Sequence, residues 1–351
     1  MKTVRRTALR WAPPVLVCAV IATLVVAPAA ARSEPAPPVL SAKPVETLVT
    51  DVLLGQRRSV SGTIRASADL GLPDLPAADL GGIGVVTSLL SGTHTLRYWQ
   101  LRSTSQRLAV LQTLAETDVI RDDTGIAAYD SRTDTATRLS FAPRPAQQVA
   151  AQPIPAFLTD LIAPGPYTSV RTGPNVWVAG RAARTLILTP RQQDTLVDHV
   201  VLAVDAQYAT ILRLQVFSRG HTAPAFAATY TDVDYAEPAA KLFDLPAIKA
   251  LPRPAVAVHA APASSQQQVA ATTPGIERVG AGWSSILVIR GLGLTRPLTG
   301  QLDSLGTKVT GGHLLQTRLL TALLTDDGTL YLGAVPASAL LTAAQAQAAA
   351  P

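Results

Sequence analysis

The chain has 351 residues, 48% of them apolar and 15% charged, and its single cysteine is Cys18. This composition indicates a globular protein and excludes a chain that is disordered throughout. Of its 30 basic residues, four lie within the first ten positions, which leaves the rest close to balance with the 24 acidic residues. A nearly neutral body argues against nucleic acid as a partner. Because no cysteine follows Cys18, the body has no disulfide and must be held together by burial.

The first 31 residues have the three parts of an export signal. Basic residues precede an apolar stretch over residues 11–31, and that stretch ends in Ala29-Ala30-Ala31. These features predict a signal peptide that is cut after Ala31. An uncleaved membrane anchor is the alternative, since the apolar stretch could span a bilayer that thins at its edges. Both interpretations predict an exported protein, periplasmic or otherwise outside the cytoplasm.

Composition divides the body into two folded parts. Residues 32–44 are rich in proline and residues 247–273 in Ala, Pro and Gln, so both are expected to be linkers. We therefore expect a large domain over residues 45–246 and a small C-terminal α+β domain over residues 274–346. A body of about 320 residues also exceeds what one hydrophobic core usually serves.

The large part begins with a helix and continues as strands. Apolar residues at helical spacing from Val45 predict a helix that ends at Gly55, and alternation then predicts a strand over residues 59–69. Residues 71–92, rich in Gly, Pro and Leu, are expected to form an apolar loop, either a lid or a surface connection. Further strands are expected over residues 94–101, 107–114, 118–121, 126–131, 136–141, 176–178, 184–189, 200–205, 209–218 and 229–235, with a short helix over residues 156–163. Short consecutive strands predict an antiparallel sheet.

The smaller part is expected to mix strands and helices. A strand is predicted over residues 285–289 and a short helix over residues 298–305. Residues 314–325 and 329–335 are expected to form a hairpin that turns at Asp326-Asp327-Gly328. The Ala-rich end, residues 336–350, predicts a helix.

A search for catalytic chemistry finds no known motif. The sequence contains no nucleophile elbow, no zinc-protease helix and no phosphate-binding loop, and its five histidines are scattered singly. Asp69, Asp74 and Asp79 recur every five residues, but prolines and leucines separate them, which does not fit a calcium loop. We therefore expect a protein that is not an enzyme, with no catalytic residue, no metal and no cofactor.

Apolar strand faces are the remaining candidates for function. The sheet has more apolar surface than two short helices and a loop can cover, so it either closes as a filled barrel or curves around a cavity for an apolar ligand. The candidate cavity residues are Val60, Ile64, Leu186, Leu188, Leu202, Leu212, Leu214 and Val216. The alternative for each is an ordinary core position. Alternation leaves open whether Leu96 and Tyr98 or Trp99 and Leu101 face inward.

The sequence resembles the LolA/RseB-like family of periplasmic lipoprotein carriers and sigma-E regulatory proteins, in its actinobacterial form. The resemblance covers residues 45–246. It is carried by residues 61–64 (SGTI), 69–73 (DLGLP), 89–99 (LLSGTHTLRYW), 107–122, 179–183 (AGRAA), 186–190 (LILTP), 211–220 and 224–226 (PAF). The chain departs from the family at residues 126–129, IAAY, where a tryptophan is common, and at residues 144–151, where Gln replaces apolar residues.

The resemblance implies a half-open antiparallel β-barrel with covering helices and a lid loop, followed by a small C-terminal α+β domain. In such proteins the concave face takes up an acyl lipid or the acyl chains of a lipoprotein. RseB-like members also bind a membrane anti-sigma factor in envelope stress signalling. Two functions are therefore expected for this chain: a membrane-associated lipid or lipoprotein carrier, or a regulator that binds a membrane protein.

Overall fold

The computed structural model describes residues 36–55, 58–72, 89–102, 105–122, 125–140, 165–244, 275–290 and 306–348. The elements below all belong to one compact unit, residues 38–351. The predicted signal segment, most of the predicted loop over residues 71–92 and the helices expected over residues 156–163 and 298–305 lie outside the described residues. Within the described ranges, no helix has the length and apolar character needed to cross a bilayer.

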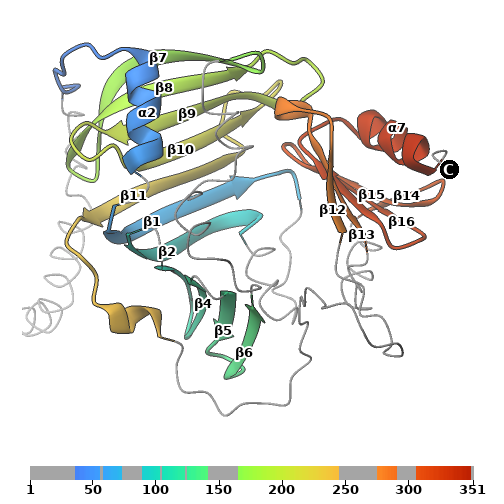
Figure 1. Ribbon diagram of the computed structural model, residues 1–351, viewed down its shortest axis with the longest axis horizontal. Coiled ribbons are helices and arrows are strands. Elements are labelled where there is room, and N and C mark those ends of the chain that lie inside the picture. The colour runs from blue at the N-terminus through green and yellow to red at the C-terminus, as the bar shows by residue number, and fades with distance from the viewer. Residues whose placement is uncertain are drawn as a thin grey trace, which may run out of the picture. The chain divides into compact units, whose positions relative to one another are not determined.

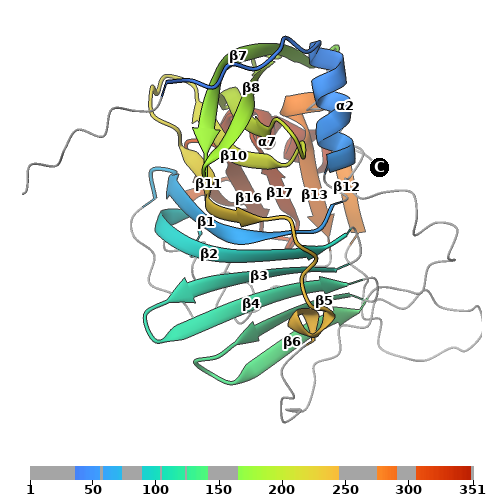
Figure 2. The same cartoon turned by 90° about the vertical axis from the view of Figure 1, so that its left-hand side faces the viewer.

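The larger of two sheets has eleven antiparallel strands and is not closed (Figures 1 and 2). Its order is β6-β5-β4-β3-β2-β1-β11-β10-β9-β8-β7, so β6 and β7 are free edges. The strands are β1 (Val60–Asp69), β2 (Ser91–Leu101), β3 (Ser105–Gln112), β4 (Ala115–Asp122), β5 (Gly125–Asp130), β6 (Thr135–Ser140), β7 (Thr168–Val178), β8 (Arg181–Pro190), β9 (Val197–Asp205), β10 (Ile211–Ser218) and β11 (Phe226–Asp234). This architecture confirms the expected half-open antiparallel barrel of the α+β class.

One helix covers part of this sheet. Helix α2 (Val45–Gly55) follows the predicted range and lies across β7 to β10 in Figure 1. Its spacing places Leu48, Val49 and Val52 on one side, where they are at most 4% exposed. A short 3-10 helix, η2 (Ala240–Phe243), follows β11 and packs on β3 and β4. Helix α2 therefore supplies the cover for the β7 to β10 half of the sheet.

Strand β7 is much longer than the sequence predicted. It starts at Thr168, whereas alternation indicated only residues 176–178. Its pairing with β8 shifts between Gly173 and Val176, around Pro174 and Asn175. A bulge changes which side chains face each side, and proline is tolerated there because β7 is an edge strand. Because of this shift, apolar and polar residues do not alternate regularly along the whole strand, and the sequence pattern identified only its last three residues.

The smaller sheet has six antiparallel strands in the order β12-β13-β17-β16-β15-β14. They are β12 (Gly275–Val279), β13 (Ile286–Arg290), β14 (Thr307–Val309), β15 (Gly312–Gln316), β16 (Thr321–Thr325) and β17 (Leu330–Gly333), and the short 3-10 helix η3 (Gly282–Ser284) precedes β13. Helix α7 (Ala337–Ala348) confirms the Ala-rich helix and packs on β16 and β17. A separate core lies between them, formed by Ile286, Val288, Leu323, Tyr331, Val335 and Leu340.

One predicted strand of the smaller sheet is wrong. The run over residues 314–325 is two strands, because residues 317–320 turn between β15 and β16. The Thr317 hydroxyl accepts hydrogen bonds from the backbone N–H groups of Leu319 and Leu320, and it donates to the Leu320 carbonyl. Such a side-chain turn competes with strand pairing. The hairpin at Asp326-Asp327-Gly328 is present, and β12 and β14 were not predicted.

Hydrogen bonds connect the two sheets. The Trp283 indole donates to Thr168 at 2.9 Å, the Thr195 hydroxyl donates to the Ala334 carbonyl at 2.8 Å, and Arg318 forms an ion pair with Asp69. The linker expected over residues 247–273 lies outside the described residues. The division into two domains therefore stays a prediction.

Candidate ligand-binding site

Five of the eight predicted cavity residues gather beneath α2. Strand pairing sets Leu186 opposite Leu202, which in turn lies opposite Leu214. The next pairs along the strands join Val200 to Leu188 and to Val216. All belong to one apolar cluster with Leu48, Val49 and Val52 of α2. Leu186, Leu188 and Leu202 are at most 4% exposed, while Leu214 and Val216 are partly buried.

The other three predicted residues lie elsewhere in the sheet. Leu212 is fully buried, and its cluster contains Val178 and Tyr230. Ile64 packs against that cluster and against a further one around Leu96. Val60 is 4% exposed but belongs to neither group. The structure therefore does not bring these three into the group beneath α2, and a ligand-binding role for any of the eight stays a prediction.

The orientation of β2, which the sequence left open, follows from its contacts. Leu96 is 6% exposed and packs with Ala66 and Val110, and Tyr98 packs near Ile64. The Arg107 guanidinium lies over the Trp99 ring, with its carbon 5.3 Å from the ring centre. Arg107 also forms an ion pair with Asp118 at 2.8 Å. Leu96 and Tyr98 therefore share a face with Ile64, and Trp99 belongs to the opposite one.

The α2 residues were missing from the predicted site. Leu48, Val49 and Val52 fill the space over the β8 and β9 side chains, and Trp283 packs against the same cluster. The helical spacing of α2 could have identified the first three as partners of the sheet. Trp283 comes from a segment that follows the last strand of the large sheet, and no local pattern links it to this site.

A groove of about 230 Å³ runs beside α2, between the helix and the turn that joins β9 to β10. Its walls carry both apolar and charged groups. They are formed by Lys43, Leu48, Asp51, Leu54, Gly55, Arg58, Arg184, Val204, Asp205, Ala206, Gln207, Tyr208 and Ala209. Leu48 and Val204 also belong to the cluster beneath α2, so the groove opens next to the five gathered candidate residues. We call it the α2 groove.

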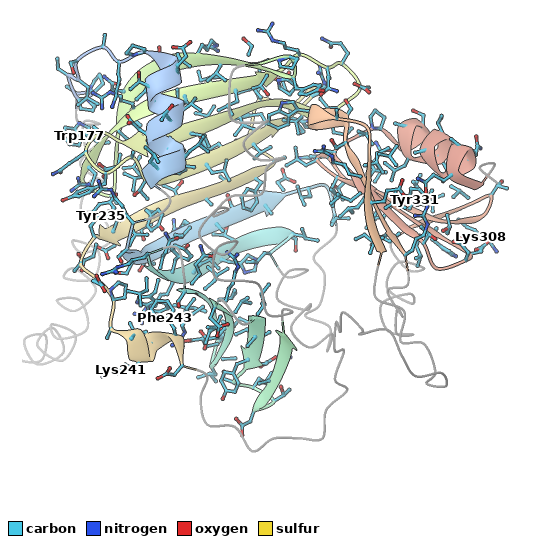
Figure 3. All side chains as sticks on the ribbon, in the orientation of Figure 1. Trp177, Tyr235, Lys241, Phe243, Lys308 and Tyr331 are labelled. Atoms are coloured by element: carbon cyan, nitrogen blue, oxygen red, sulfur yellow. The ribbon has the colours of Figure 1, made fainter. Side chains whose placement is uncertain are left out.

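Asp205 organises one end of the α2 groove. Its side chain is 1% exposed and forms an ion pair with Arg181. It also accepts hydrogen bonds from the backbone N–H groups of Gln207 and Tyr208 at 2.8 and 2.9 Å. Tyr235, labelled in Figure 3, donates a further one at 2.9 Å.

These contacts decide the charge of Asp205. Burial raises the pKa of its carboxyl group, but the hydrogen bonds from Arg181 and from the backbone outweigh burial. The pKa of Asp205 is therefore lowered, and the group is an anion already committed to its neighbours.

A second hollow of about 370 Å³ lies between α7 and the smaller sheet. Arg290, Leu323 and Tyr331 are among its lining residues. Arg290 is engaged by Glu277 at 2.8 Å, and Leu323 and Tyr331 belong to the core of the small sheet. No predicted cavity residue lines this hollow. Within the described ranges, no group of three or more His, Cys, Asp or Glu side chains could hold a metal ion.

No family model and no curated protein matches the sequence. Among solved structures, a MucA/MucB complex from Pseudomonas aeruginosa aligns with a TM-score of 0.47 and 17% identity, over 85% of this chain and 96% of that chain. A crystal structure of MucB aligns with a TM-score of 0.45 and 17% identity, over 86% and 95%. A LolA superfamily protein from Nitrosomonas europaea aligns with a TM-score of 0.24 and 12% identity, over 59% and 99%.

These neighbours are consistent with the LolA/RseB-like resemblance of the sequence. Every TM-score quoted is below 0.5, so a function for this chain has to rest on its own residues.

Proposed function

We propose that the chain is an exported, non-enzymatic protein that binds the acyl chains of a lipid or lipoprotein on the sheet face beneath α2. One observation carries the proposal. The open sheet gathers five apolar side chains, from Leu186 to Val216, on one face, and the cover there is a helix of 11 residues. A short helix on an unclosed sheet can exchange some of its contacts for those of a flexible apolar ligand more easily than a full layer of structure can.

The energetics favour such an exchange. Burying an alkyl chain contributes about 0.8 kcal/mol for each CH₂ group, so a chain of ordinary length offsets the contacts of a few leucine and valine side chains. On α2 the buried apolar residues are Leu48, Val49 and Val52. Their loss from the face costs on the order of 2 kcal/mol each when they become exposed. An acyl chain inserted between α2 and the sheet can therefore offset the contacts that these residues lose.

Placement outside the cytoplasm follows from the predicted signal segment, residues 1–31. The acyl-bearing partners of a protein at the cell envelope are membrane lipids and lipoproteins, so a carrier reaches its ligand only when it is exported. Cleavage predicts a mobile carrier. An uncleaved anchor predicts that the protein acts near the membrane.

The test is native mass spectrometry with lipid extraction, on the exported protein purified from its cell envelope under mild conditions. We expect a co-purifying acyl lipid or acylated peptide. The variant Leu214→Gln, which places a polar group on the face beneath α2, should lower its occupancy. The matched control is Leu287→Gln on the smaller sheet, where Leu287 is 36% exposed. A protein that is empty and also fails to take up added 1-hexadecanol would overturn the proposal.

The second candidate is a regulator that binds a membrane anti-sigma factor, as the sequence resemblance implies. It is favoured by the hydrogen bonds that connect the sheets, since Trp283, Thr195 and Arg318 each contact the other sheet. A fixed pair of sheets presents one composite surface to a protein partner.

This alternative is tested by a photo-reactive residue at Leu287 in cells. A regulator should cross-link to a membrane protein whose cytoplasmic part binds a sigma factor. This adduct should be unaffected by Leu214→Gln but lost in Arg318→Gln, which removes an ion pair between the sheets. A carrier should give no such adduct. Its bound lipid should be lost in Leu214→Gln but kept in Arg318→Gln.

A further inference from the structure

We propose that the α2 groove binds an oxyanion, the carboxylate or phosphate head group of the amphiphile whose chain lies beneath α2. Arg184 and Arg58 would supply the positive charge. The inference deepens the proposed function and rests on it for the hydrocarbon part; the oxyanion site itself stands on the groove.

Arg184 is the central residue of this argument. Alternation along β8 places it on the same face as Leu186 and Leu188, the face that α2 covers. Its two terminal nitrogens donate to the carbonyls of Ala206 and Ser41, both at 3.3 Å, which is beyond the usual range for such bonds. Its Nε is buried and has no hydrogen-bond partner among the described residues. A buried guanidinium donor without a partner is costly and calls for an acceptor.

Arg58 supplies a second guanidinium without an acidic partner in the described part of the chain. Its charge lies 5.9 Å from the ring centre of Tyr208, and both residues line the α2 groove. A guanidinium stacked on a ring keeps its donors free for a ligand.

The two carboxylates of the α2 groove are committed elsewhere. Asp51 forms an ion pair with Lys43, and Asp205 forms one with Arg181. Arg58 and Arg184 remain as the cations whose charge no described carboxylate balances. The helix end at Gly55 adds some negative potential, so the groove suits a head group of low charge better than a polyanion.

The size of the α2 groove fits a head group. Its volume of about 230 Å³ is below the roughly 300 to 1,000 Å³ of pockets that enclose whole drug-sized ligands. Beyond the α2 groove, the pairs between β8 and β9 become apolar. Arg184 lies opposite Val204, Leu186 opposite Leu202, and Leu188 opposite Val200. One charged row followed by two apolar rows matches a molecule with an anionic head and a hydrocarbon chain. Guanidinium groups bind carboxylate and phosphate through two parallel hydrogen bonds.

The experiment is isothermal titration of the exported protein, freed of lipid, with five probes. Palmitate and lysophosphatidic acid carry a chain and an anionic head, 1-hexadecanol carries the chain alone, and acetate and inorganic phosphate carry the anion alone. We expect palmitate or lysophosphatidic acid to bind at least about tenfold more tightly than 1-hexadecanol, the size of one charge-assisted hydrogen bond. Added salt should reduce this difference.

Two variants of Arg184 and one control variant test the site. Arg184→Gln should remove the difference between the charged and the neutral chain, and Arg184→Lys should keep part of it, since the charge remains but the planar donor group does not. The matched control is Arg97→Gln, an exposed arginine on β2 that does not line the groove. Thermal unfolding of each variant checks that it is folded.

The outcomes separate the two proposals. Equal binding of charged and neutral chains, unchanged in Arg184→Gln, overturns the oxyanion site while the acyl-binding function survives. Failure of all three chains overturns the acyl-binding function, and binding of acetate or phosphate that Arg184→Gln abolishes then supports a site for a free oxyanion. If neither a chain nor an anion binds, both proposals fall.

Discussion

The indole N–H of Trp283 donates a 2.9 Å hydrogen bond to the hydroxyl of Thr168, and these residues belong to different sheets. Thr168 begins edge strand β7 and is fully buried, while Trp283 lies in the 3-10 turn before β13. The backbone N–H of Trp283 also donates to Gln192 at 2.8 Å. The Trp283 side chain therefore packs against the apolar cluster beneath α2 and connects the small sheet to it.

Replacing Trp283 with Phe should test how strongly this contact couples the sheets. Phe keeps much of the apolar packing but leaves the buried Thr168 hydroxyl without its donor, which we expect to cost about 1 to 3 kcal/mol of unfolding free energy. Urea denaturation of Trp283→Phe, Thr168→Val and the double variant gives the coupling energy. Trp177→Phe, at a position 41% exposed, is the control and should change little. Additive effects would show that the hydrogen bond contributes nothing.

Local patterns were sufficient for the elements whose period is regular. Helix α2 matches its predicted range because five apolar residues keep helical spacing and Gly55 ends it. Strand β10 matches closely because leucine and valine alternate with polar neighbours, and most of β9 was found because residues 200–204 form a continuous apolar run. Two runs were mispredicted: β7, whose pairing shifts register at Gly173, and residues 314–325, which Thr317 divides into two strands.

The site was only partly predictable for a different reason. Alternation identified the face that carries Leu186, Leu202 and Leu214, since all three point the same way from neighbouring strands. It missed the covering residues and the arginines of the α2 groove. Arg184 occupies an inward position in the same alternation, but a charged residue there reads as an exposed one unless its neighbours are known.

Gly55 is expected to be required where α2 ends. A Cβ added there would lie 2.6 Å from the carbonyl oxygen of Ala209, so the helix end or the β9–β10 turn would have to move. Helix propensity alone would make Gly55→Ala stabilising by about 1 kcal/mol. We expect the opposite sign, a lower urea midpoint, because the contact is with rigid backbone. Thr50→Ala, exposed on the same helix, is the control and should be neutral or slightly stabilising.

Asp205 should make folding sensitive to acid. Its pKa is lowered in the folded protein, so its contribution to stability is fully present above the unfolded pKa of about 3.9 and is lost as the pH falls through the lower folded value. Asp205→Asn breaks the pair with Arg181 and should cost on the order of 3 kcal/mol at neutral pH. The variant should also lose less stability than the wild type below pH 4. Asp232→Asn, on an exposed residue of β11, should leave both values unchanged.

Tyr98 should have the corresponding effect at high pH. Burial raises the pKa of Tyr98 to about 12, although Arg121 opposes the shift. A raised folded pKa gives stability that is fully present below the unfolded pKa of about 10 and is lost as the pH rises through the folded value. Between those limits the wild type should lose about 2 kcal/mol that Tyr98→Phe does not lose.

Unfolding free energies measured from pH 9 to pH 12 check this prediction. Tyr98→Phe also removes the 2.6 Å hydrogen bond to Gln100, so the variant should start from a lower stability at neutral pH. The slope carries the information about titration. Parallel curves for the two proteins would contradict the assignment.

Leu114 is the clearest case of a residue that the fold tolerates at a cost. It lies in the turn between β3 and β4, has a φ of 61° and is fully exposed. Its side chain therefore makes no packing contacts that offset the free-energy cost of the left-handed backbone conformation. Leu114→Gly should stabilise the protein by about 0.5 to 1 kcal/mol, since glycine adopts this conformation freely but loses more entropy on folding. Leu114→Ala removes the exposed side chain and keeps the Cβ, so it should leave the urea midpoint unchanged. Equal gains from both variants would show that the apolar side chain, and not the backbone, carries the cost.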